Sequence, residues 1–245
     1  MNLDALFRLH RDLPRQGPGS DRATLEALGA LPPLPPSPFG LDLGCGPGKQ
    51  TLLLARRLGC PILAVDLHRP FLDELESRAR DAGLSHLVQT RCADMGRLDI
   101  APGSVDLIWS EGAIYNLGFE QGLRLWRPLL RENGLVMASE LTWLTPTPPD
   151  EVETFWQQAY PGMGDIAGNC EAAERAGYRV LDARPLPSAE WWPDYYAPLE
   201  ERCRMLAEDP MPGLADAIAA ARAEIDLLRR FPDAYGYVYY SLKAA

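Results

Sequence analysis

Three glycines at alternate positions point most directly to chemistry in this chain. They lie in the segment Leu41-Asp42-Leu43-Gly44-Cys45-Gly46-Pro47-Gly48-Lys49-Gln50-Thr51. Because glycine has no Cβ, such a run lets the backbone turn sharply and approach a ligand closely. The residues after it favour a helix, whose free N–H groups and positive dipole end attract an anionic group. The segment therefore predicts a site for a nucleotide-like ligand with an anionic end.

Two familiar phosphate-binding turns fit this segment less well. A P-loop requires GxxxxGK[ST], but only three residues separate Gly44 from Gly48, and Gln50 follows Lys49. A dinucleotide site requires GxGxxG, and Lys49 occupies the position of the third glycine, where it would block close helix–strand contact. An NAD-dependent oxidoreductase stays open as an alternative function.

The pattern Asp-x-Gly-x-Gly-x-Gly at the end of a strand resembles motif I of the class I, Rossmann-like methyltransferases that use S-adenosylmethionine (SAM). The resemblance implies that SAM binds at the turn and leaves as S-adenosylhomocysteine (SAH), with contacts from Asp42, Gly44, Cys45, Gly46, Gly48, Gln50 and Thr51. It also implies that Asp42 orders the turn and reaches the methionine amino group. A methionine carboxylate needs fewer N–H donors than a pyrophosphate, so GxGxG suffices.

Acidic residues follow the next strands at positions that support this resemblance. Asp66 lies 20 residues after Gly46, where a carboxylate accepts hydrogen bonds from ribose hydroxyls, and Leu67 follows it. The resemblance implies that Asp94 takes the adenine amino group and that the Met95 N–H meets the ring. It implies that the Ser110 carbonyl accepts from the methionine amino group. An Asp94 that only caps its loop is the plainer alternative.

The acceptor side rests on weaker signals. Glu111 is the ionisable residue nearest the expected acceptor, so we take it as a catalytic candidate together with Tyr115. The expected substrate pocket contains Asn116, Trp143, Trp191, Tyr195 and Tyr196. A sulfonium is already activated, so the protein mainly aligns acceptor and methyl group, and a base is needed only when the acceptor loses a proton. The aromatic residues could instead form a small core or a dimer contact, and Glu111 could be a loop acid bonded to nearby amides.

Alternating strands and helices set the expected fold. Near-continuous apolar strands are predicted at 39–43, 61–66, 87–91, 105–109 and 135–141, with further strands at 178–186 and 235–242. Helices are predicted at 49–58, 70–82, 120–131, 151–159 and 213–230, after an N-terminal helical stretch. The pattern predicts an α/β fold: a doubly wound, mostly parallel, seven-stranded sheet with an antiparallel last strand and a helical lid between the last two strands.

Composition shifts divide the chain into four expected parts. Residues 1–38 form a helical segment and a proline-rich connector, and residues 39–186 form the SAM-binding core, with an irregular insertion at 142–176. Residues 187–232 form the lid and 233–245 the final strand of the core. The segments 16–20, 110–120, 155–156 and 233–238 also resemble a bacterial small-molecule subgroup related to the ubiquinone/menaquinone-biosynthesis methyltransferases.

Net charge and cysteine content limit the kinds of substrate, metal and cellular location that we expect for this protein. The formal net charge of −10 disfavours nucleic acid, because an acidic surface repels phosphates. Five widely spaced cysteines and three histidines suggest no metal site, and free buried thiols fit a reducing cytoplasm. The N-terminus lacks a signal-peptide pattern, and no apolar run is long enough for a membrane span. We therefore expect a cytoplasmic methyltransferase for a small-molecule acceptor, with a homodimer left open. A protein that binds SAM or SAH without transferring methyl is the second alternative.

Overall fold

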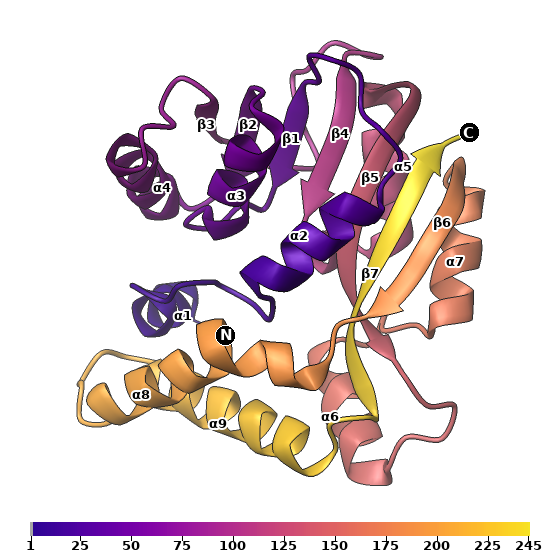
Figure 1. Ribbon diagram of the computed structural model, residues 1–245. Helices are drawn as coiled ribbons and strands as arrows, with labels where there is room; N and C mark the ends of the chain where they lie inside the picture. The colour runs from indigo at the N-terminus through magenta and orange to yellow at the C-terminus, as the bar shows by residue number, and fades with distance from the viewer. Residues whose placement is uncertain (1) are drawn as a thin grey trace.

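A single seven-stranded sheet organises the protein. The structure, a computed structural model, describes residues 2–245. The strand order is β3-β2-β1-β4-β5-β7-β6 (Figure 1). The strands are β1 (Gly40–Leu43), β2 (Ile62–Asp66), β3 (Val88–Cys92), β4 (Val105–Ser110), β5 (Leu130–Trp143), β6 (Tyr178–Pro185) and β7 (Tyr235–Ala244). Strands β1 to β5 pair in parallel, and β7 pairs antiparallel with both β5 and β6. The predicted fold class and antiparallel last strand are confirmed.

Helices cover both faces of this sheet. Helices α2 (Asp21–Ala30), α3 (Lys49–Leu58) and α4 (Arg69–Asp81) bury one face, while α5 (Phe119–Trp126) and α7 (Ile166–Arg175) bury the other. The strands β1 and β4 are buried along their whole length. Cover on both sides explains why these strands read as near-continuous apolar runs.

Local signals in the sequence begin and end several of these helices as expected. The Ser20 hydroxyl accepts a hydrogen bond from the Ala23 N–H and so caps α2. Gly59 and Gly83 follow α3 and α4 with φ values of 62° and 69°, the left-handed conformation that glycine supplies at a helix end. Pro70 lies in the first turn of α4, where its missing N–H costs nothing.

A second group of helices lies beyond the carboxyl ends of the parallel strands. It comprises α1 (Leu3–His10), α6 (Asp150–Ala159), α8 (Ala197–Met205) and α9 (Leu214–Arg230) (Figure 1). Between β6 and α8 the chain forms a 3₁₀ turn, η3 (Ser188–Trp191), and a π-helical turn, η4 (Trp192–Tyr196). Helix α1 packs on α8 and α9, so the N-terminal helix and the insertion between β6 and β7 lie in one layer. No helix within residues 2–245 is both long and apolar enough to cross a membrane.

Two predictions of secondary structure were wrong. The helix expected to reach residue 131 ends at Trp126, because Pro128 belongs to a 3₁₀ turn, η2 (Arg127–Leu129), and β5 begins directly after it. Asn133, just past that predicted helix, lies inside β5 with a φ of 63°. The stretch expected to be irregular also contains α7, capped by Asp165, which small residues and Gly168 concealed from a periodicity argument.

Candidate active site

The glycine turn has the conformation that the sequence predicted. Gly44, Gly46 and Gly48 have φ values of 72°, 53° and 77°. The N–H groups of Gly44 and Cys45 donate to the Val65 carbonyl at 2.8 and 3.0 Å, which ties the turn to β2. A Cβ at Gly44 would lie 2.3 Å from the Ala113 Cβ. The backbone itself therefore forms this part of the site wall.

The third glycine serves a different purpose from the one expected. Gly48 does not line the cavity, although it was predicted to contact the cofactor. A Cβ on Gly48 would lie 2.2 Å from Leu75 Cδ1 of α4. Close contact between the turn and α4 is thus the physical reason for this glycine.

Asp66 holds two backbone segments together at the end of β2. Its carboxylate accepts hydrogen bonds from the Gly46 N–H at 2.9 Å and the His68 N–H at 2.8 Å. Burial raises the pKa of Asp66, while these two amide donors lower it. Each carboxylate oxygen has a further lone pair, and Asp66 lines the cavity. It can therefore accept hydrogen bonds from a ligand hydroxyl.

Asp42 lies fully buried behind the turn and does not itself line the cavity. Its Oδ2 accepts the Thr51 hydroxyl at 2.5 Å, and its Oδ1 has no hydrogen-bond partner among residues 2–245. Burial raises the pKa of Asp42 to about 7. Thr51 does not line the cavity, so its expected ligand contact is replaced by this bond to Asp42. Gln50 does line the cavity and donates to the Cys45 carbonyl.

The wall expected to meet adenine is apolar. Leu67, Ala93 and Met95 line the cavity, but Asp94 does not. Asp94 Oδ1 accepts a hydrogen bond from the Gly96 N–H at 2.8 Å, which caps its own loop. Asp94 thus caps its loop, and its expected contact with adenine stays a prediction.

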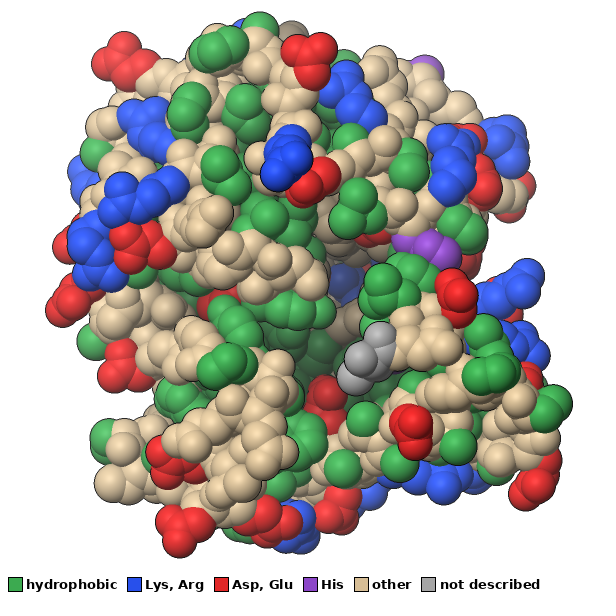
Figure 2. Space-filling view, turned by 180° about the vertical axis from the view of Figure 1, so that it is seen from behind, with side chains coloured by type: hydrophobic (Ala, Val, Ile, Leu, Met, Phe, Trp, Pro, Cys, Tyr) green, Lys and Arg blue, Asp and Glu red, His purple; other side chains and the backbone are tan. Residues whose placement is uncertain are grey.

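One cavity of about 790 Å³ extends from the glycine turn to the helices beyond the sheet. Figure 2 shows this hollow on the molecular surface, with hydrophobic side chains around it. Away from the turn it widens into what we call the acceptor chamber, lined by Leu6, His10, Tyr115, Leu141, Trp156, Tyr160, Trp191, Tyr195, Ala217, Ala220, Ala221, Glu224 and Tyr237. Three predicted residues, Tyr115, Trp191 and Tyr195, belong to it, and Asn116 lines the same cavity.

Two predicted pocket aromatics lie elsewhere. Trp143 ends β5. Its backbone N–H donates to the Gly164 carbonyl, and its side chain packs on the core. Tyr196 is fully buried behind the chamber wall, and its hydroxyl donates to Glu224 Oε1 at 2.6 Å. Neither lines the cavity. Consecutive aromatic residues cannot all face one space, because the backbone turns each side chain in a different direction.

Glu111 lines the cavity, but its oxygens are occupied. It accepts hydrogen bonds from Arg15 at 2.8 Å, Thr24 at 2.7 Å, the Trp109 indole at 2.8 Å and Tyr239 at 3.3 Å. The side chains of Arg15 and Glu111 are only 3% and 4% exposed. A carboxylate with four donors is poorly placed to take a proton from an acceptor. These contacts give Glu111 a structural role, and the catalytic role expected for it stays a prediction.

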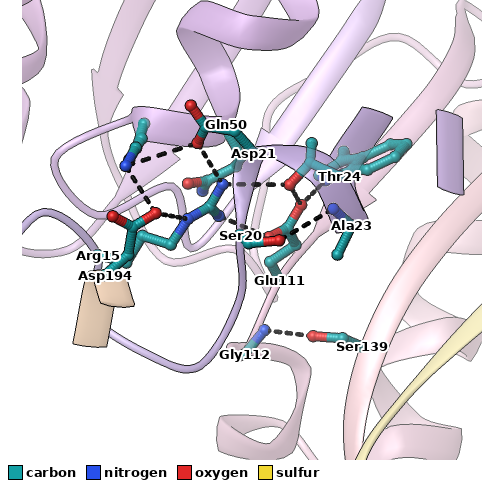
Figure 3. Close-up of polar contacts among 12 residues, drawn as sticks. Arg15, Ser20, Asp21, Ala23, Thr24, Gln50, Glu111, Gly112, Ser139 and Asp194 are labelled. Atoms are coloured by element: carbon teal, nitrogen blue, oxygen red, sulfur yellow. Dashed lines mark hydrogen bonds and ion pairs between the residues drawn. The ribbon is translucent and has the colours of Figure 1, made fainter. Parts of the chain in front are cut away.

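Arg15 connects four segments around the cavity. Its guanidinium pairs with Glu111 after β4 and with Asp21 at the start of α2, and it lies 3.8 Å from Asp194 of η4 (Figure 3). Lys49, the first residue of α3, pairs with the same Asp194 at 2.7 Å. These ion pairs join the N-terminal segment, the core and the insertion beside the glycine turn.

Ser110 is also buried away from the cavity. Its hydroxyl donates to the Leu43 carbonyl at 2.8 Å, which links β4 to β1. The residues that follow it, Glu111, Gly112 and Ala113, do line the cavity. The expected contact of the Ser110 carbonyl with the methionine amino group stays a prediction.

Sequence reasoning missed three kinds of site residue. The N-terminal Arg15 and Gln16 line the cavity, and a Cβ at Gly46 would lie 3.1 Å from Gln16 Cγ. Glu224 was missed although it interrupts the small-residue face of α9. His10 was missed because nothing in the local sequence indicates that α1 packs on α9.

Within residues 2–245, no group of three His, Cys, Asp or Glu side chains is arranged to hold a metal.

Comparison with known proteins matches the part of the chain that contains the glycine turn. Residues 41–134 match the family model described as "Methyltransferase domain". Methyltransferase GfsG from Streptomyces halstedii is 32% identical over 102 residues, which cover 41% of this chain and 37% of the relative. The chain thus spans little more than a third of that curated relative. The resemblance to class I SAM-dependent methyltransferases is confirmed, and the narrower subgroup stays a prediction.

Solved structures match nearly the whole chain in fold. A SAM-dependent methyltransferase from Geobacter sulfurreducens in complex with SAH has a TM-score of 0.83 at 19% identity, covering 99% of this chain and 98% of that one. The [4+2]-cyclase SpnF has a TM-score of 0.79 at 19% identity, covering 99% and 92%. The fold is that of the class I methyltransferases, and it also occurs in a protein described by a different reaction.

Proposed function

We propose that this protein is a SAM-dependent methyltransferase that modifies a small organic acceptor. The observation that carries the proposal is the single cavity that joins the glycine turn and Asp66 to the acceptor chamber. Its volume of about 790 Å³ lies within the range of roughly 300–1,000 Å³ typical of small-molecule sites. Cofactor and acceptor can thus share one continuous space.

The groups of SAM find matching partners among the residues of the cavity and the layer behind it. Asp42 Oδ1 is buried without a donor, and the methionine ammonium would supply one. The start of α3 suits the methionine carboxylate. Asp66 suits the ribose hydroxyls, and the apolar wall of Leu67, Ala93 and Met95 suits adenine. Bound SAM supplies a methyl group on a positively charged sulfur, which an acceptor displaces directly.

The protein's own residues would contribute alignment and exclusion of water. Positioning of two reactants can lower a barrier by about 7–11 kcal/mol. Helix α1, the turns η3 and η4, and α9 close the chamber, so we assign residues 187–232 the role of a lid. Tyr115, from the loop after β4, is a candidate contact to the acceptor.

Titration calorimetry with SAM, SAH and NADH tests the first step. We expect SAM and SAH to bind and NADH not to bind; preferential NADH binding would favour the oxidoreductase alternative. Incubation with methyl-labelled SAM and a metabolite panel tests the second step. SAM binding without transfer to any panel member would favour a SAM-binding protein with another reaction, and the fold of SpnF makes that a concrete second candidate.

We also propose a reducing cytoplasm as its location and no nucleic-acid substrate. All five cysteines are free thiols, including the exposed Cys92. Free exposed thiols persist best where glutathione keeps them reduced. The net charge of −10 opposes binding to phosphate backbones. Retention on heparin at physiological salt would contradict the second part.

A further inference from the structure

Two hydroxyl groups of the acceptor chamber, those of Tyr160 and Tyr195, direct their hydrogens toward protein atoms. His10 Nδ1 lies 3.0 Å from the Leu6 carbonyl, which can only accept, so Nδ1 carries the hydrogen. Burial lowers the pKa of His10 and favours its neutral form. Nε2 is then an acceptor, and the Tyr195 hydroxyl, 3.3 Å away, donates to it.

Two further tyrosines donate to carboxylates. The Tyr160 hydroxyl, in the chamber wall, donates to Glu140 Oε1 at 2.6 Å, and the Tyr196 hydroxyl donates to Glu224 Oε1 at 2.6 Å. With their hydrogens used in this way, the oxygens of Tyr160 and Tyr195 offer a ligand lone pairs only. These two oxygens favour a ligand that donates hydrogen bonds, while the indole N–H groups of Trp156 and Trp191 have no partner among residues 2–245 and can donate to a ligand acceptor.

The cationic side chains of the cavity are held at its other end. Among the described residues that line it, Arg15 and Lys49 are the only arginine and lysine. Arg15 pairs with Glu111 and Asp21, and Lys49 pairs with Asp194. A carboxylate or phosphate on the acceptor would find no free counter-ion in the chamber.

Glu224 is the acidic side chain that lines the chamber. It projects from the face of α9 that also carries Ala217, Ala220 and Ala221, so no bulky neighbour covers it on that face. Within residues 2–245 its recorded hydrogen-bond partner is Tyr196, on Oε1. Burial raises its pKa, a cost that a bound cation would relieve. Rings of Trp191, Tyr195 and Tyr237 line the same space, and aromatic faces attract cations.

We propose that the acceptor chamber binds an apolar molecule that carries one organic ammonium group, with Glu224 as its counter-ion. This inference rests on the proposed function, because it names the class of acceptor for the same site. It assigns Glu224 a binding role. It disfavours anionic acceptors such as carboxylates and phosphate esters, which would find no unpaired arginine or lysine in the chamber.

Binding of three matched probes in the presence of saturating SAH tests the proposal. The probes are (2-phenylethyl)trimethylammonium, its neutral isostere (3,3-dimethylbutyl)benzene, and the anion 3-phenylpropanoate, followed by tryptophan fluorescence. The quaternary cation can neither lose a proton nor accept a methyl group. We expect the cation to bind at least about tenfold more tightly than the isostere and the anion not to bind. Equal binding of cation and isostere, or tighter binding of the anion, would overturn the proposal.

Variants locate the effect. We expect Glu224→Gln to weaken cation binding about 10–100-fold and to leave the isostere unchanged. Glu224→Asp, which keeps the charge, should retain most of the cation affinity. Glu208→Gln, an exposed acid that does not line the cavity, is the matched charge control and should have no effect. Undiminished cation binding by Glu224→Gln would refute the assignment.

The comparison among probes in the wild-type protein needs no variant, so it stands even if Glu224→Gln fails to fold. A wild type that binds SAH but not the cation would reject this inference and leave the proposed function intact. A wild type that binds the cation but neither SAM nor SAH would reject the proposed function instead.

Discussion

The two ends of the cavity are built in different ways. The central part of the cofactor end, the glycine turn and Asp66, lies at the carboxyl ends of the neighbouring strands β1 and β2, which are close together in the sequence. The acceptor chamber takes its wall from α1, β5, α6, η3, η4 and α9, which are far apart in the sequence. The first end is determined by local conformation, and the second depends on how distant elements pack together.

This contrast explains which substitutions each end should tolerate. A backbone turn with left-handed glycines admits no side chain at Gly46, whatever the surroundings do. The chamber is lined by aromatic and small apolar side chains that can repack with modest loss. We therefore expect SAM affinity to respond sharply to single changes, and acceptor preference to respond gradually.

The largest effect should come from Gly46→Val. A branched side chain at φ 53° strains the turn and places methyl groups where Gln16 and the ligand lie. We expect SAM binding to fall below detection by calorimetry. Gly59→Val, with a φ of 62° and no atom within 4 Å of a Cβ, carries the same backbone strain away from the site and should still bind SAM. Normal SAM binding by a folded Gly46→Val protein would remove the turn from the site.

Next in size is the effect of Arg15→Ala on stability. Removing one member of a buried ion pair leaves Glu111 without its counter-ion, which typically costs about 3–5 kcal/mol. Urea unfolding measures the change. Arg69→Ala breaks exposed pairs with Asp73 and Glu76 and should alter stability little. If both variants lose equally little, Arg15 does not join the two ends of the cavity.

A smaller effect is expected for Asp66→Ala. Loss of a charged hydrogen-bond acceptor for the ribose should weaken SAM binding by about 1.5–3 kcal/mol. Asp94→Ala is the informative partner, because Asp94 caps its own loop and does not line the cavity. We expect its SAM affinity to stay within about a factor of three of wild type. A loss as large as that of Asp66→Ala would restore the adenine contact that the sequence suggested.

The smallest effect concerns pH. Burial raises the pKa of Asp42 to about 7, so below pH 7 the carboxyl is mostly protonated. A methionine ammonium prefers the ionised form, so SAM affinity should rise with pH, by up to about tenfold per unit between pH 5.5 and 7. This window lies below the ordinary α-ammonium pKa of about 7.7–8.0. Asp42→Asn should flatten the profile. A wild-type affinity that is independent of pH would separate Asp42 from the ammonium.

Sequence periodicity predicted most of the sheet and the helices beside it. The strands β1 to β4 and the helices α3 and α4 lie within one or two residues of their predicted bounds. Burial on both faces leaves apolar runs, and glycines at positive φ end the helices, so the signals are local. The helix α7 and the early end of α5 escaped prediction, because small residues and Pro128 break the periodicity there.

The sequence alone determined the glycine turn, Asp66 and the order of elements around them, because each depends on the conformation of a few neighbouring residues. Only the tertiary structure decided that Arg15 neutralises Glu111, that Asp94 and Tyr196 lie outside the cavity, and that His10 and Glu224 lie inside it. These contacts join residues up to some 200 positions apart. No local pattern encodes them, since they arise when α1 and α9 pack beyond the carboxyl ends of the strands.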